Sequence, residues 1–228
     1  MSETLAERIA AVERSIAEAA RNACRKTSEV SLIAVSKTHT AATIREAIGC
    51  GLRVFGENKV QEAESKIVEL GRDSAEWHLI GHLQSNKARK AVRLFDVIES
   101  VDSVELAARL ERICEEEGRN ELQVLIQVDL ALEATKNGAT EAELPSIVDF
   151  LGGCKRLKLM GLMTLPPFFD DPELARPFFR KLRELRDSFV PGGELSMGMS
   201  HDFAVAIAEG ATLVRVGTAI FGEREYQR

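Results

Sequence analysis

The segment Leu32-Ile33-Ala34-Val35-Ser36-Lys37 runs from apolar residues straight into a lysine, and an amphipathic helical pattern follows soon after it. A short apolar run before a helical pattern predicts a buried parallel strand. Lys37 is therefore expected where this strand leaves the core. Burial disfavours the ammonium form of a lysine, and a neutral amine can attack a carbonyl and form a Schiff base. The alternative is a lysine at the strand edge whose ammonium group reaches water.

Composition limits the classes of function. The chain has 228 residues, of which 45% are hydrophobic and 29% charged, and its net charge is -6. This charge argues against a nucleic-acid-binding protein, and no basic patch indicates a membrane surface. No apolar run is long enough to span a bilayer, and the acidic start, Met1-Ser2-Glu3-Thr4, does not resemble a signal peptide. The four cysteines are scattered without a CxxC pair, which is typical of reduced thiols in a cytoplasmic protein.

Strand and helix patterns alternate along the chain. Apolar residues at helical spacing between about residues 3 and 26 predict a helix before the first strand. Strands are expected at about 32–37, 52–55, 77–80, 95–101, 123–129, 157–165, 194–199 and 212–216, each followed by a helix. Eight such repeats predict an α/β protein, a single (β/α)8 barrel over residues 1–228 with the helix of residues 1–30 packed on it. An open doubly wound sheet is the alternative, but its glycine fingerprint follows none of the strands.

The junction after the fourth strand carries a helix-start signal. Asp102 is expected to cap the next helix, and Glu105 stands three residues later, as in a capping box. Val101 and Leu106 are spaced as a hydrophobic staple. A helix is therefore expected directly after Asp102.

Binding groups of such barrels lie at the C-terminal ends of the strands. Those ends carry Lys37, Glu57-Asn58, His82, Asp129, Thr164, Ser200-His201 and Gly217-Thr218. A phosphate site after strands seven and eight is common in this fold, and here Ser200 offers a hydroxyl while Gly217 and Thr218 offer backbone N–H groups. The alternative for Gly217-Thr218 is a plain turn with a helix cap. A Schiff-base lysine that faces a phosphate site indicates pyridoxal 5'-phosphate (PLP).

Arg215 lies in the eighth strand, two residues before Gly217, so that strand alternation can place both on one face. An always-charged guanidinium beside the pyridine nitrogen would keep that nitrogen unprotonated. An acidic partner would instead strengthen the ring as an electron sink. The alternative for Arg215 is a structural ion pair.

Six motifs occur in order along nearly the whole chain: LIAVSK, FGEN-x-VQE, WHLIG-x-LQSNK, GLM, SMGMS-x-D and VRVGTAIFG. Together they resemble the pyridoxal phosphate homeostasis protein family. The resemblance implies a fold-type III PLP barrel similar to the N-terminal domain of alanine racemase. It also implies these cofactor-binding residues: Lys37 as the Schiff-base lysine, Arg215 at the pyridine nitrogen, Ser200, Gly217 and Thr218 at the phosphate, and Asn58, of the FGEN motif, near the cofactor. Lys59 and Thr40 depart from many relatives, which have Tyr and Pro there, but neither is a proposed ligand.

The function that the resemblance implies is PLP storage, delivery and buffering in the cytoplasm. PLP-requiring apo-enzymes are candidate partners, the protein is expected to be a monomer, and no catalytic residue or metal site is expected. A PLP-dependent racemase or decarboxylase is the alternative. Racemisation needs an acid or base on each face of the substrate carbon, and the one tyrosine, Tyr226, stands near the end of the chain.

Two further hypotheses concern a different role for Lys37 and the roles of the histidines. A barrel aldolase that uses Lys37 on a sugar phosphate is a third hypothesis. His78 and His82 have the i, i+4 spacing of a metal site, which serves a metal only on a helix, whereas a strand is expected there. His82 and His201 are expected either at the mouth of the pocket or in solvent-facing loops.

Overall fold

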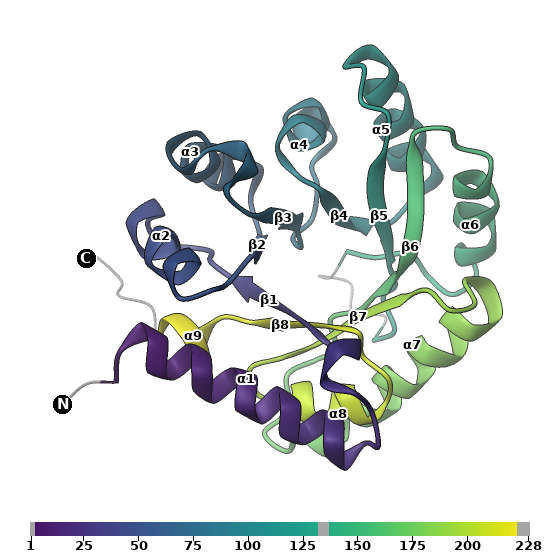
Figure 1. The fold of residues 1–228 in the computed structure, drawn as a ribbon. Helices are drawn as coiled ribbons and strands as arrows, with labels where there is room; N and C mark the ends of the chain where they lie inside the picture. The colour runs from purple at the N-terminus through teal and green to yellow at the C-terminus, as the bar shows by residue number, and fades with distance from the viewer. Residues whose placement is uncertain (1–2, 132–136, 223–228) are drawn as a thin grey trace.

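Eight parallel strands pair in chain order and close into a barrel, with helices on its outside (Figure 1). In this computed structural model, residues 3–131 and 137–222 are described. The barrel closes where β8 pairs with β1, with Ser31 opposite Leu213 and Ile33 opposite Arg215. The predicted (β/α)8 barrel is confirmed. No helix within the two described ranges is long and apolar enough to cross a membrane.

The strands are short, and each of the eight has three or more buried residues. Their bounds are β1 Ser31–Val35, β2 Val54–Glu57, β3 Glu76–Leu79, β4 Val97–Val101, β5 Leu122–Gln127, β6 Leu157–Met163, β7 Glu194–Met199 and β8 Leu213–Val216. The α-helices are α1 Leu5–Asn22, α2 Ala41–Gly49, α3 Val60–Leu70, α4 Ala88–Leu94, α5 Val104–Glu116, α6 Leu144–Gly152, α7 Arg176–Phe189, α8 Phe203–Ala208 and α9 Thr218–Phe221. Each strand end differs by only a few residues from the sequence prediction.

Helix α1 precedes the first strand and lies alongside α8 and α9 (Figure 1). Thr4 and Glu7 form a capping box at its start. One face of α1 is buried, including Leu5 and Ile16. Arg25, which follows the helix, donates from Nη1 to two carbonyl oxygens, that of Ile207 in α8 at 3.0 Å and that of Ala211 in the turn after α8 at 2.7 Å.

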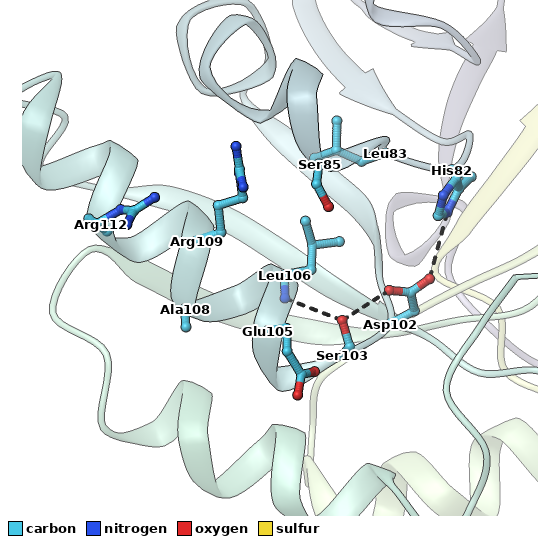
Figure 2. A pocket seen from close by; sticks show the side chains of 10 residues that line it. All are labelled: His82, Leu83, Ser85, Asp102, Ser103, Glu105, Leu106, Ala108, Arg109 and Arg112. Atoms are coloured by element: carbon cyan, nitrogen blue, oxygen red, sulfur yellow. Dashed lines mark hydrogen bonds and ion pairs between the residues drawn. The ribbon is translucent and has the colours of Figure 1, made fainter.

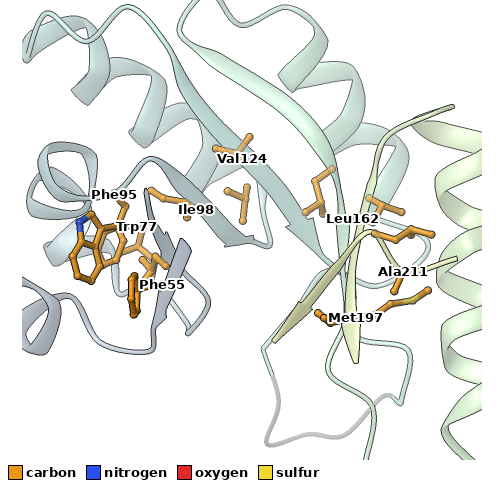
Figure 3. Packing of buried hydrophobic residues seen from close by; sticks show 14 of the residues in the cluster. Phe55, Trp77, Phe95, Ile98, Val124, Leu162, Met197 and Ala211 are labelled. Carbon is orange, nitrogen blue, oxygen red and sulfur yellow. The ribbon is translucent and has the colours of Figure 1, made fainter. Parts of the chain in front are cut away.

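The core has two parts because strand residues alternate between the outside and the inside of the barrel. The larger part packs strands against helices and includes Phe55, Trp77 and Phe95 (Figure 3). The smaller part is a separate cluster of Val97, Leu125 and Met163. Alternation along β4 places Glu99 on the same face as Val97, so a charged group belongs to the inside of the barrel.

The predicted start of α5 is wrong by one residue. Ser103, not Asp102, is the N-cap, and its side chain accepts a hydrogen bond from the Leu106 N–H at 3.2 Å. Glu105 is therefore the second helical residue, so the predicted capping box is absent, and Val101 and Leu106 do not occupy the N′ and N4 positions of a hydrophobic staple. Both Asp and Ser are good N-caps, so their adjacency leaves the sequence pattern ambiguous.

Candidate functional site

The predicted site residues lie at one end of the barrel, because the carboxyl ends of parallel strands meet there. β1 ends at Val35, so Lys37 lies in the turn beyond the strand, where it is half-buried. Asn58 follows β2, Ser200 follows β7, and Gly217 with Thr218 follows β8.

The ends of β7 and β8 meet at Ser200 and Gly217. The Gly217 N–H donates to Ser200 Oγ over 3.4 Å, and Thr218 begins α9 directly afterwards. A Cβ on Gly217 would lie 3.3 Å from the carbonyl oxygen of Val35, at the end of β1. Glycine thus lets the start of α9 lie close to β1, with a hydroxyl and backbone N–H groups gathered at one point.

Arg215 is buried on the inner face of β8. Its Nη1 donates to Ser196 Oγ at 2.5 Å, its Nη2 donates to the Thr164 carbonyl oxygen at 2.8 Å, and Nη1 lies 4.0 Å from Glu99 Oε2. Burial lowers the pKa of Arg215 and the carboxylate of Glu99 raises it, while a guanidinium keeps its charge in proteins. The structure therefore holds this cation rigidly and gives it a carboxylate partner.

His78 completes this buried network, and sequence reasoning missed it. Its Nδ1 lies 2.6 Å from Glu99 Oε1 and its Nε2 lies 3.0 Å from Glu76 Oε1. Burial alone would lower the pKa of His78, but the bonds to Glu76 and Glu99 outweigh burial and raise the pKa to about 9. In turn, burial would raise the pKa of Glu99, and His78 with Arg215 lowers it. The available signal was the alternation that puts Glu99 and Arg215 inside the barrel.

A second buried cluster lies beside Lys37, and it too was missed. Lys66 of α3 is buried, and its Nζ donates to Glu57 Oε1 at 2.7 Å, to Glu62 Oε1 at 2.7 Å and to the Ser36 carbonyl oxygen at 2.8 Å. Burial raises the pKa of Glu57, against the effect of Lys66. Sequence alone shows only a charged helix, in which Glu62 and Lys66 have i, i+4 spacing.

Asn58 lines a cavity of about 240 Å³ at the barrel mouth, together with Gly81, His82, Gln127 and Asp129. Its Oδ1 is buried and has no hydrogen-bond partner among the described residues. Buried polar atoms are nearly always paired, so this amide is a candidate for binding a ligand. A Cβ on Gly81 would lie 2.2 Å from the Asn58 carbonyl oxygen, so only glycine permits this close approach.

A larger cavity of about 590 Å³ lies to one side of the barrel mouth, against α5 (Figure 2). His82 and Arg109 line it, and His82 Nδ1 lies 3.7 Å from Asp102 Oδ2. None of the six predicted cofactor residues lines this cavity, so its size does not identify it as the site. The smaller cavity, by contrast, is lined by Asn58, one of the six predicted cofactor residues, and also by His82. We therefore assign the smaller cavity to the candidate site.

Two more residues from the sequence analysis are His201 and Tyr226. His201 is exposed, and its Nε2 lies 3.0 Å from the Asp170 carbonyl oxygen in the loop that follows β6. Its ring packs against that of Phe168, with centroids 5.4 Å apart. Tyr226 lies outside the described residues.

Comparison with known proteins identifies relatives over nearly the whole chain. The family model described as "Alanine racemase, N-terminal domain" matches residues 9–225. The chain is 43% identical to the pyridoxal phosphate homeostasis protein of Aquifex aeolicus, over 96% of this chain and 98% of that protein. It is 44% identical to the protein of the same name from Pseudomonas aeruginosa, over 98% of this chain and 97% of that protein.

Solved structures give the same fold. PipY of Synechococcus elongatus PCC7942, solved with PLP bound, has a TM-score of 0.83 and 42% identity over 96% of this chain and 100% of its own. Alanine racemase from Corynebacterium glutamicum has a TM-score of 0.64 and 18% identity, over 95% of this chain and 64% of its own. At that identity the likeness to alanine racemase concerns the fold alone.

Proposed function

The chain belongs to the pyridoxal phosphate homeostasis protein family, and from this premise we propose that it binds PLP as a Schiff base on Lys37 and acts in PLP storage, delivery and buffering. When bound, PLP supplies an aldehyde that a lysine amine can bond and a ring that accepts electrons. The relative PipY, 42% identical, was solved with PLP bound.

The residues at the barrel mouth fit the different parts of PLP. Ser200 Oγ and the N–H groups of Gly217 and Thr218 supply donors for the phosphate at the junction of β7 and β8. The Oδ1 atom of Asn58 is buried and unpaired among the described residues, which marks it as an acceptor for a donor group of the ligand. Lys37 lies in the turn after β1, the strand that pairs with β8.

The observation that carries the proposal of a carrier rather than an enzyme is the setting of Arg215. Ser196 and Thr164 hold the guanidinium, which we propose faces the pyridine nitrogen. A fixed cation there opposes protonation of the ring nitrogen, and an unprotonated ring stabilises carbanions poorly. We therefore propose that the protein turns over amino acids slowly or not at all, as the names of its relatives also suggest.

The experiment compares absorption spectra of the purified protein, Lys37→Ala and Lys59→Ala after addition of PLP. Lys59 is an exposed lysine at the same end of the barrel and serves as the matched control. The parent and Lys59→Ala are expected to show a Schiff-base band that Lys37→Ala lacks, and borohydride reduction with peptide mapping is expected to find the label on Lys37. A parent protein without the band contradicts PLP binding through a Schiff base and favours the sugar-phosphate aldolase. Steady turnover in an amino-acid screen, lost in Lys37→Ala, identifies a racemase or decarboxylase instead.

We also propose that residues 1–228 form one PLP-binding domain that acts as a cytoplasmic monomer and transfers PLP to apo-enzymes that require it. The large exposed hydrophobic side chains of the described residues, Val68, Phe168 and Leu174, are too few for an extended apolar interface. The four cysteines are free thiols, as is usual in a reducing compartment. Light scattering on the purified protein measures the oligomeric state directly.

A further inference from the structure

Three charged side chains hold the polypeptide on both sides of Lys37. Ser36, which precedes Lys37, donates from Oγ to Glu57 Oε1 at 2.6 Å. Its carbonyl oxygen accepts from Lys66 Nζ at 2.8 Å. On the other side, the N–H of the following residue, Thr38, donates to Glu62 Oε1. We call Glu57, Glu62 and Lys66 the turn cluster.

The turn cluster is a connected unit. Lys66 Nζ lies 2.7 Å from both Glu57 Oε1 and Glu62 Oε1. The Lys66 side chain is 7% exposed and that of Glu57 0%, whereas that of Glu62 is 27% exposed. One ammonium group therefore links the end of β2 to helix α3 and to the backbone of the Lys37 turn.

The turn itself is unfavourable without such support. Thr38 has a φ of 70°, in the left-handed region that a β-branched residue rarely adopts. A residue in such a conformation persists only where its surroundings determine it. The hydrogen bond from the Thr38 N–H to Glu62 fixes this residue directly, and the bonds to Ser36 fix the other end of the turn.

We infer that Glu57, Glu62 and Lys66 are positioning residues that hold Lys37 in the orientation needed for its covalent bond to a cofactor aldehyde. The inference rests on the proposed function of Lys37. In that step the amine nitrogen bonds to the aldehyde carbon, and the aldehyde oxygen leaves as water. Correct placement of the amine lowers the cost of reaching the bonded geometry.

Stability alone does not account for the turn cluster. A buried ion pair is on average no more stabilising than well-packed apolar residues of similar size. Besides pairing with one another, these charged groups bind the Ser36 hydroxyl, the Ser36 carbonyl oxygen and the Thr38 N–H. Ser36 and Thr38 are the two chain neighbours of Lys37. The common feature of these contacts is therefore the lysine between them.

The test uses Glu62, because it is partly exposed and its loss leaves the Lys66–Glu57 pair in place. Glu64 lies on the same helix and pairs with Lys90 at 2.6 Å on the surface, so Glu64→Ala is the matched control. The rate of Schiff-base formation is followed by stopped-flow absorbance after mixing each apo-protein with PLP. Glu62→Ala is expected to slow this rate at least about tenfold, as loss of one charge-assisted hydrogen bond would. Glu62→Gln, which keeps an acceptor for the Thr38 N–H, is expected to slow it less, and Glu64→Ala to leave it unchanged.

A second measurement separates positioning from damage to the pocket. The analogue 4'-deoxypyridoxine 5'-phosphate has a methyl group in place of the aldehyde, so its affinity reports on the pocket without Lys37 chemistry. We expect Glu62→Ala to bind this analogue as the parent does. Equal rates for Glu62→Ala and Glu64→Ala overturn the inference, and so does an analogue affinity that falls as much as the rate. A parent protein without a Lys37-dependent band overturns the proposed function itself, and the inference falls with it.

Lys66→Met provides an independent variant. It removes the link between Glu57, Glu62 and Ser36, so a larger loss of rate than in Glu62→Ala is expected, with the analogue still bound. Its thermal unfolding midpoint is measured first, and if this variant does not fold, the Glu62 and Glu64 variants decide the question. A folded Lys66→Met protein with the parent's rate overturns the inference.

Discussion

His78, a buried residue of β3, carries a positive charge. Because its pKa is raised to about 9, both ring nitrogens are protonated at neutral pH and donate to Glu76 and Glu99. Glu99 thereby has cations on both sides, His78 at 2.6 Å and Arg215 at 4.0 Å. The charge of Arg215, on which the proposed carrier function depends, is thus balanced within a closed set of side chains.

From the raised pKa of His78 we predict that the free energy of unfolding falls at alkaline pH. A group whose pKa is raised on folding adds stability below its unfolded pKa and loses it as pH rises through the folded pKa. For His78 the stabilisation is full below about pH 6.5 and disappears by about pH 9, a difference of about 3 kcal/mol. Urea unfolding from pH 6 to 10 measures it, with His78→Gln as the reference. The gap in unfolding free energy between parent and variant is expected to close as pH rises, and a constant gap contradicts the assignment.

At the scale of single elements, the N-cap of α5 allows a prediction about the free energy of unfolding. Ser103→Ala removes the acceptor for the Leu106 N–H and is expected to lower the free energy of unfolding by about 1 kcal/mol. Asp102→Ala is expected to cost less, because Asp102 is not the N-cap. Urea unfolding of both variants is the measurement. A larger loss in Asp102→Ala than in Ser103→Ala would mean that the cap lies where the sequence pattern placed it.

Features that depend on residues close together in the sequence could be predicted, whereas features that depend on how strands and helices pair could not. Runs such as Leu32–Val35 identify strands because burial on both faces selects apolar residues locally. The cap of α5 was misplaced by one residue since two good caps are adjacent. The pairing of His78 with Glu99 depends on the register between β3 and β4, where His78 lies opposite Val97. That register is a tertiary property, so neither this pair nor the turn cluster could be predicted from local patterns.

The six residues proposed to bind the cofactor can be considered in the same way. They lie at or near the strand ends that the barrel brings to one mouth. The positions of Lys37 and Gly217 in the fold were predictable, because position at a strand end follows from the alternation of strands and helices. The residues that support them, such as Lys66 on a helix, carry no sequence signal that separates them from ordinary surface charge.

For the whole molecule, α1 holds the first and last parts of the barrel together. Arg25→Met removes the donor to two carbonyl oxygens in α8 and the turn after it, and is expected to lower the unfolding free energy by about 2 kcal/mol. Arg21→Met is the control, because Arg21 is an exposed arginine in the last turn of α1, four residues before Arg25. Urea unfolding with intrinsic fluorescence measures both. An Arg25→Met protein as stable as the control would show that these contacts add nothing to closure.

The contacts of α1 also have a consequence for synthesis. Its partners α8 and α9 begin about 180 residues later than α1 ends, so a ribosome making 5–20 residues per second needs roughly 10 to 40 s to supply them. During that time the apolar stripe of α1, including Ile9 and Val12, lacks its main native contacts, which α8 and α9 provide. The apolar face of α1 can therefore be fully covered only after α9, the helix that follows the last strand of the barrel, has emerged from the ribosome.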